Sequence, residues 1–167
     1  SDLLSELRNK SKAAIDSLGL RKLKGAIRKR ESIAATRYIG IPDSQVHFLN
    51  LPFYETGKVQ KSNPTQVDID FTSQLITDIK PHQIYAAGDL ADPHGTHRIC
   101  LNIIFDSLTQ LKRQSFMDDC WVWLYRGAWQ EFDVHEIEMA VPMSPDQVLR
   151  KRKAIFYHQS QKDGVMF

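Results

Sequence analysis

The feature that most constrains the fold of this chain is a regular alternation of helix-like and strand-like patterns. Apolar residues recur at helical spacing in residues 22–38, 64–79 and 96–112, and short apolar runs typical of strands occupy residues 45–50 and 83–89. Because parallel strands need a crossover connection that is usually a helix, this order predicts a mostly parallel sheet with right-handed crossovers. We therefore expect an α/β fold built as a single domain.

Composition places the chain among ordinary globular proteins. Its 167 residues are 42% hydrophobic and 25% charged, with a formal net charge of +2. The basic excess lies in the first thirty residues, and no nucleic-acid-binding motif accompanies it, so we expect a solvated helix face and no nucleic-acid partner. No apolar run approaches the roughly 20 residues that cross a bilayer, so we expect no membrane partner and a cytoplasmic protein. Cys100 and Cys120 lack CxxC spacing and are expected to be reduced packing residues.

Capping residues and breakers define the expected helices. A polar helix over residues 2–17 is expected to be interrupted at Leu18-Gly19-Leu20, and the helix over 22–38 should stop at Gly40. Asn63 is predicted to cap the next helix, with Pro64 at its first position. Ser144 to Gln147 form a capping-box pattern that should open a last helix reaching about residue 161.

The strand patterns differ in their expected surroundings. The segment "QIYAAGD", residues 83–89, has the continuous apolar character of a strand covered on both faces. Two further strand patterns follow, "CWVWLYRG" and "DVHEIEMAVP", and the second alternates as edge strands do. The first leaves two interpretations open for its aromatic residues, ordinary core or an exposed aromatic surface.

Two histidines, His94 and His97, stand in the loop after the strand at 83–89. In open parallel sheets, ligands bind at the loops that leave the carboxyl ends of strands, and an i, i+3 spacing at a helix start can turn two rings toward one point. Asp89 and Asp92 are the nearest carboxylates, and they serve equally well as ligands, as partners that orient the imidazoles or as helix caps. A catalytic zinc takes three protein ligands, so this loop offers a partial metal site, and an ordinary surface or core role remains open.

Three segments together resemble a known family, the LmbE-like or PIG-L deacetylases. These are "RKRESIAATRYIG" with Arg28 and Glu31, "DPHGTH" with the two histidines, and "KRKAIFYHQSQ" with His158. The resemblance implies a Rossmann-like sheet with helices on both faces, and a zinc enzyme that removes the acetyl group from an N-acetylated amino sugar.

For individual residues, the resemblance implies specific roles. His97 would be a zinc ligand and His94 a catalytic group that stabilises the oxyanion. Arg28, Glu55 and His158 would contact the substrate, an N-acetylated amino sugar or a sugar phosphate. Two alternatives stay open: Arg28 could pair with Glu31 as a structural contact, and His158 could simply end a helix. Asp89 and Asp92 would lie behind the metal ligands and orient them.

The chain also departs from that family. The family's first motif, His-Pro-Asp-Asp, supplies two zinc ligands and the general base, and nothing like it occurs in these residues. The sequence further resembles the carboxyl-terminal region of Bacteroidetes proteins that join a glucosamine-6-phosphate deaminase-like domain to an LmbE-like domain. We therefore expect a fragment, incomplete at its N-terminus, of a larger amino-sugar protein, with weak zinc binding and no deacetylase activity by itself.

A second hypothesis remains open. The chain would then be a non-catalytic module that binds a sugar phosphate, or that supports assembly of a deaminase-like partner. The aromatic side chains between residues 120 and 132 favour this hypothesis if they lie at the surface. There they would suit a contact in a homo-oligomer or a surface on which a sugar stacks.

Overall fold

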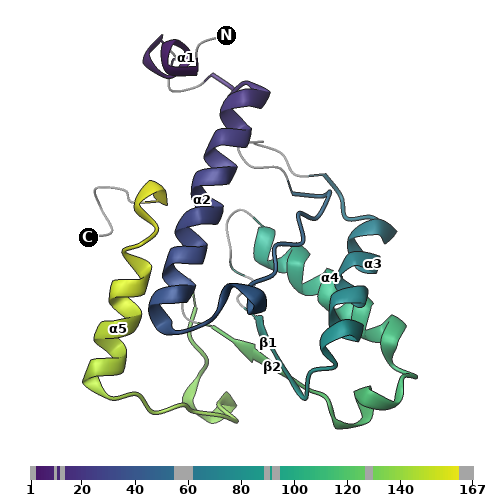
Figure 1. The fold of residues 1–167 in the computed structure, drawn as a ribbon. Helices are drawn as coiled ribbons and strands as arrows, with labels where there is room; N and C mark the ends of the chain where they lie inside the picture. Colours follow the sequence, from purple (N-terminus) through teal and green to yellow (C-terminus); the bar gives the residue numbers. More distant parts are fainter. Residues whose placement is uncertain are drawn as a thin grey trace. The chain divides into compact units, whose positions relative to one another are not determined.

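The computed structural model describes residues 3–9, 11, 14–54, 62–88, 91, 95–126 and 130–161. The chain divides into two compact units, one made of residues 1–48, 55–60 and 141–167, and the other of residues 49–54 and 61–140. The helices are α1 (Leu3–Asn9), α2 (Leu18–Ile39), α3 (Gln66–Ile79), α4 (Thr96–Leu111) and α5 (Pro145–Ile155), and the strands are β1 (Gln83–Ala87) and β2 (Trp121–Tyr125) (Figure 1). Short 3-10 turns occupy Asp43–Gln45, Ser115–Asp119, Val134–Glu136 and Gln159–Gln161.

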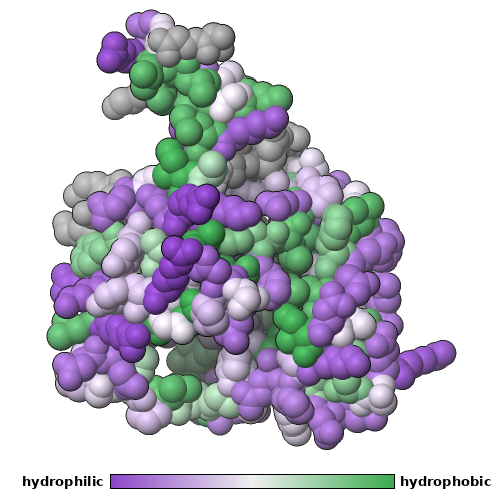
Figure 2. Space-filling model, viewed as in Figure 1, coloured by the Kyte–Doolittle hydropathy of each residue, from purple (hydrophilic) through white to green (hydrophobic). Residues whose placement is uncertain are grey.

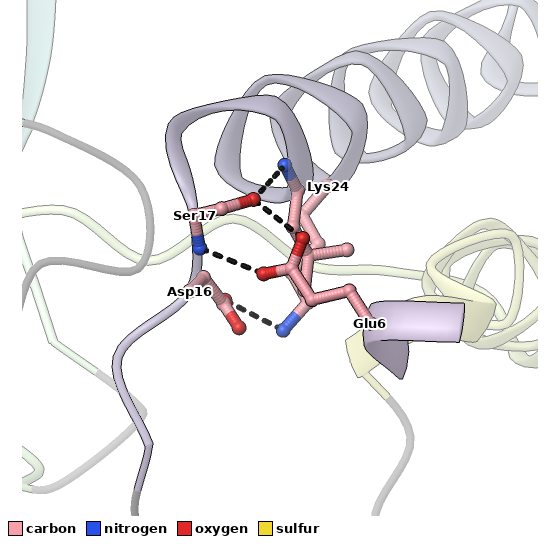
Figure 3. A network of polar contacts seen from close by, with 5 residues as sticks. Glu6, Asp16, Ser17 and Lys24 are labelled. Atoms are coloured by element: carbon pink, nitrogen blue, oxygen red, sulfur yellow. Dashed lines mark hydrogen bonds and ion pairs between the residues drawn. The ribbon is translucent and has the colours of Figure 1, made fainter. Parts of the chain in front are cut away.

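The start of α2 in the first unit is fixed by side-chain capping. The Ser17 hydroxyl accepts a hydrogen bond from the Leu20 N–H at 3.2 Å, and Ser17 donates its own N–H and hydroxyl to the Glu6 carboxylate (Figure 3). Lys24 Nζ lies 2.7 Å from Asp16 Oδ2. The expected break at residues 18–20 is therefore wrong, because these residues form the first turn of α2 and the interruption precedes Ser17.

The end of α2 was predicted correctly. Gly40 has a φ of 97°, and its N–H donates to Arg37 O while the Ile41 N–H donates to Thr36 O. This left-handed C-cap favours glycine because a Cβ would be strained there.

Helix α5 packs beside α2 in the same unit (Figure 1). The predicted capping box is present, since the Ser144 hydroxyl accepts from the Gln147 N–H and the Gln147 side chain accepts from the Ser144 N–H. The Tyr38 and Tyr157 rings lie 5.3 Å apart between centroids. The helix ends at Ile155, earlier than the predicted residue 161, and a 3-10 turn at Gln159–Gln161 follows.

The second unit carries the sheet. Strands β1 and β2 are parallel, with Gln83 paired to Trp121 and Ala87 to Tyr125. The two helices of this unit pack on each other, and α4 also contacts β1. The buried apolar residues of this unit are Phe53, Ile76, Ala86, Leu101, Ile103 and Leu111. The α/β character and the parallel pairing are thus confirmed, whereas the Rossmann-like arrangement stays a prediction.

Asp68 anchors the start of α3 from inside the protein. Its side chain is fully buried, and its carboxylate accepts from the Phe53 N–H at 3.0 Å, the Thr65 N–H at 2.8 Å and the Thr65 hydroxyl at 3.0 Å. Burial raises the pKa of Asp68, but these hydrogen bonds outweigh it and hold the pKa below its usual value. The helix therefore begins after Thr65 and not after the predicted cap, Asn63.

Two predicted strands are wrong. Among the described residues the sheet consists of β1 and β2 alone, so no neighbouring strand pairs with residues 45–50, and Asn50 turns the chain with a φ of 49°. In the segment at 133–142, Asp133 and Glu136 form a capping box around a short 3-10 turn, which replaces extended backbone by local hydrogen bonding.

Several apolar side chains lie at the surface. In the described part of the chain, Tyr85 of β1 is 54% exposed. This exposure contradicts the prediction that the strand is covered on both faces. On β2, Trp121 and Tyr125 are 66% and 56% exposed, so the surface interpretation holds for these two, whereas Trp123 between them is half-buried. Hydrophobic side chains also gather over α1 and the first half of α2, at the top of Figure 2.

No described helix combines the length and the apolar character that a membrane crossing requires.

Candidate functional site

Two of the three segments that suggested an active site meet in the first unit. The Glu31 carboxylate, on α2, accepts hydrogen bonds from the Ser160 N–H at 2.7 Å and from the Ser160 hydroxyl at 2.6 Å. These residues are 129 positions apart in sequence. The arrangement places the segment "HQSQ", which follows α5, against the segment "RKRE" of α2.

The charges around Glu31 are consistent with a polar site. The side-chain hydrogen bond from Ser160 lowers the pKa of Glu31 against the opposing effect of burial, and the Ser160 backbone hydrogen bond lowers it further. The positive charges of His158 and Arg28 act in the same direction. Arg28 and His158, both predicted substrate contacts, are therefore brought together around one carboxylate.

The bonding of Glu31 corrects one expectation. Its printed hydrogen bonds in the described part of the chain come from Ser160, whereas Arg28 acts on Glu31 through its charge. Arg28 is half-buried and its guanidinium is not held by a hydrogen bond to Glu31 there. A simple Arg28–Glu31 pair is thus not the contact that joins these segments.

A groove of about 350 Å³ lies beside this cluster, between α2 and α5. Its walls are mainly apolar, with Ala35 and Ile39 from α2 and Ile155 from α5. Three residues that can carry positive charge also line it: Arg150, Lys151 and His158. Arg150 Nη2 donates to Tyr38 O at 3.2 Å, which ties α5 to the last turn of α2.

The third segment lies in the second unit, where β1 leads to α4. Gly95 precedes α4 with a φ of 68°, its carbonyl accepts from the Ile99 N–H at 3.1 Å, and His97 occupies the first turn of the helix. His97 is half-buried. The predicted position of His97, at a helix start after the carboxyl end of a parallel strand, is confirmed, and its role as a zinc ligand stays a prediction.

The remaining predicted site residues, His94, Glu55, Asp89 and Asp92, lie outside the described residues. A catalytic zinc takes three protein ligands. The described ranges contain no group of three or more His, Cys, Asp or Glu residues able to hold a metal ion. The described residues alone therefore do not complete a zinc site.

Sequence reasoning missed Ser160 and Arg150 as site residues. Ser160 stands in the quoted segment "HQSQ", but no sequence pattern indicates that its backbone and hydroxyl both bind Glu31. A lone serine after a helix carries no signal of its own. Arg150 lies in the basic run "RKRK", where periodicity does not say which cation faces α2.

Comparisons with known proteins found similarity to a curated protein. No protein-family model matches the chain, and no solved structure matches it. A curated protein of Bacteroides thetaiotaomicron, named "Putative glucosamine-6-phosphate deaminase-like protein", is 46% identical over 163 residues, which are 96% of this chain and 25% of that protein. The chain thus spans about a quarter of the length of the curated relative that it matches, and its similarity to a protein of that name agrees with the expected deaminase-like connection.

Proposed function

We propose that this chain is part of a longer amino-sugar protein and contributes one side of a zinc-dependent deacetylase site. The observation that carries the proposal is the contact between Glu31 and Ser160, because it assembles two segments that resemble deacetylase motifs into one cluster. The name of the Bacteroides relative supports the amino-sugar context.

The reaction would be hydrolysis of an acetamide, in which water adds to the carbonyl carbon and acetate leaves the sugar amine. Zinc would activate that water, and His97 would supply one of its ligands. His94 would stabilise the oxyanion that develops on the carbonyl oxygen. The general base and further metal ligands would come from outside the described residues, with Asp89 and Asp92 as candidates for orienting the ligands.

The cluster around Glu31 would bind the substrate. Arg28 and His158 offer positive charge to a sugar hydroxyl or phosphate, and Glu31 holds the segment that carries His158 in place through Ser160. Glu55 would add a further contact to the sugar.

A second candidate function is a non-catalytic module that binds a sugar phosphate or supports assembly of a deaminase-like protein. The exposed aromatic strand β2 favours it, since the Trp121 and Trp123 rings stack with centroids 6.4 Å apart and Trp121 is largely exposed. Such rings suit either the face of a sugar or a second subunit.

Zinc stoichiometry separates the two functions. We expect the longer protein to bind zinc tightly, the 167-residue chain to bind it weakly, and His97→Ala to lower the zinc content of the longer protein. His135→Ala is the matched control, because His135 is exposed on the short turn Val134–Glu136 and has no proposed role. Equal zinc content in the His97→Ala and wild-type proteins would remove His97 from the site and favour the non-catalytic module.

A further inference from the structure

The second unit contains an apolar cavity that the chain does not fill. Its volume is about 490 Å³, and it opens to the surface, since Ile79 in its lining is 52% exposed. Its lining is almost entirely apolar and comes from α3, α4, β1 and the segment before residue 52: Leu49, Leu51, Leu75, Ile76, Ile79, Ile84, Ile103 and Ile104 are among the lining residues. An apolar cavity of this size is expected to be occupied by apolar groups.

One border of the cavity is the free edge of a strand. The Trp121 N–H donates to His82 O and the Gly88 N–H donates to Tyr125 O, so the even-numbered residues of β1 direct their backbone groups toward β2. The backbone N–H and C=O groups of the odd-numbered residues consequently point toward the opposite edge of β1; these residues are Gln83, Tyr85 and Ala87. Among the described residues no third strand pairs with that edge, and Gln83 and Ile84 both line the cavity.

A second stretch of chain, residues 49–51, adds apolar side chains to the lining of the cavity. Leu49 and Leu51 both contribute side chains to the cavity lining. The cavity is therefore bordered by an edge of β1 that no other described strand pairs with and by the apolar side chains of Leu49 and Leu51. An extended peptide satisfies both features at once, because its backbone pairs with β1 while every second side chain enters the apolar space.

We propose that the edge of β1 and the adjoining cavity bind an extended, apolar β-strand from polypeptide outside these 167 residues. Such a strand has an available source, since the chain matches only 25% of its Bacteroides relative and most of such a protein lies beyond the matched region. The added strand converts β1 from an edge strand into an inner strand of the sheet. This inference rests on the proposal that the chain is part of a longer protein, and it does not depend on the proposed deacetylase activity.

Peptide binding monitored by amide hydrogen exchange tests this proposal. The probes are overlapping 15-residue peptides that span the Bacteroides relative outside its matched quarter, each added to the 167-residue chain. We expect an apolar peptide to slow exchange of the Tyr85 and Ala87 amides at least tenfold and to leave the Val122 and Leu124 amides, on the outer edge of β2, unchanged.

Two variants on α3 locate the binding. Ile79→Glu places a charge in the cavity lining, whereas Val67→Glu places the same charge outside that lining. Ile79 and Val67 are 52% and 50% exposed, so both variants should fold. Ile79→Glu is expected to weaken peptide binding at least tenfold, and Val67→Glu to leave it unchanged.

Three results would overturn the proposal. The first is that no peptide slows exchange of the Tyr85 and Ala87 amides, and the second is that a peptide slows exchange at the outer edge of β2 instead. The third is that exchange of the Tyr85 and Ala87 amides slows without peptide as the chain concentration rises, which would assign the edge to a second copy of the chain. The exchange pattern of the unsubstituted chain decides these outcomes even if a variant fails to fold. Since the test measures no acetate release and no zinc, its failure is distinguishable from failure of the proposed function.

Discussion

Ser160 donates both its backbone N–H and its hydroxyl to the carboxylate of Glu31, and this pair joins α2 to the segment that follows α5. His158 and Arg28 both act electrostatically on that carboxylate and lower the pKa of Glu31 further. Two of the predicted substrate-binding residues, Arg28 and His158, thus act on the same carboxylate within one unit.

Ser160→Ala is expected to raise the pKa of Glu31 toward its ordinary value, because the side-chain hydrogen bond from Ser160 is the largest cause of its lowered pKa. An NMR titration of the Glu31 carboxyl measures this shift. Ser144→Ala is the control, since Ser144 caps α5 and makes its hydrogen bonds with Gln147. An unchanged Glu31 pKa in Ser160→Ala would show that this contact does not form in solution.

Asp68→Asn is expected to destabilise the chain by about 1–3 kcal/mol, because one side-chain oxygen that accepts buried hydrogen bonds is replaced by a donor. Urea unfolding measures the loss. Asp70→Asn on the same helix is the matched control, since Asp70 is exposed, and it should change the stability by no more than about 0.5 kcal/mol. Equal stability of the two variants would contradict the anchoring role of Asp68.

The stability that the Asp68 carboxylate contributes should depend on pH. The pKa of Asp68 is lower in the folded than in the unfolded state, where it is about 3.9, so its stabilisation is complete above that value and is lost as the pH falls through the folded pKa. The stability advantage of the wild-type chain over Asp68→Asn should therefore shrink between about pH 5 and about pH 2. An advantage that stays constant over this range would rule out the ionised carboxylate as its source.

Gly88→Ala is expected to destabilise the junction that follows β1, by about 1–3 kcal/mol. A Cβ at residue 88 would lie 2.8 Å from Leu124 Cβ, and the Gly88 N–H donates to Tyr125 O at 2.8 Å. Urea unfolding measures the effect, and Gln83→Ala at the exposed other end of β1 is the control, with a change within about 0.5 kcal/mol. Equal unfolding midpoints for the two variants would contradict the close approach of Gly88 to β2.

The helices were the most predictable part of the fold. Helix α4 was predicted to within one residue because its apolar spacing is regular, and Gly40 and Ser144 marked their helix ends through local chemistry. Strands were harder to predict, since a strand forms only where another strand pairs with it over several residues, and residues 45–50 belong to no strand of the described sheet. The buried acid Asp68 was missed because its burial depends on Phe53, fifteen residues away.

The candidate site was predictable in its parts and not in its assembly. Sequence motifs selected Arg28 and His158, and the structure brings both to Glu31, but the link through Ser160 depends on long-range packing. His97 was placed correctly at a helix start because the strand, loop and helix pattern is local.

Acetate release by the longer protein tests the central claim most directly. N-acetylglucosamine and its 6-phosphate are the substrates, and the wild-type, His97→Ala and His135→Ala proteins are compared. Substitution of a residue that only orients a metal ligand already lowers metal affinity or activity by about 10–100-fold. Loss of a ligand itself should therefore lower the rate of acetate release by at least about a hundredfold. The account predicts that the wild-type and His135→Ala proteins release acetate, and that His97→Ala releases acetate at least a hundredfold more slowly. The absence of acetate release by the wild-type protein, or equal rates of release by all three proteins, would contradict it.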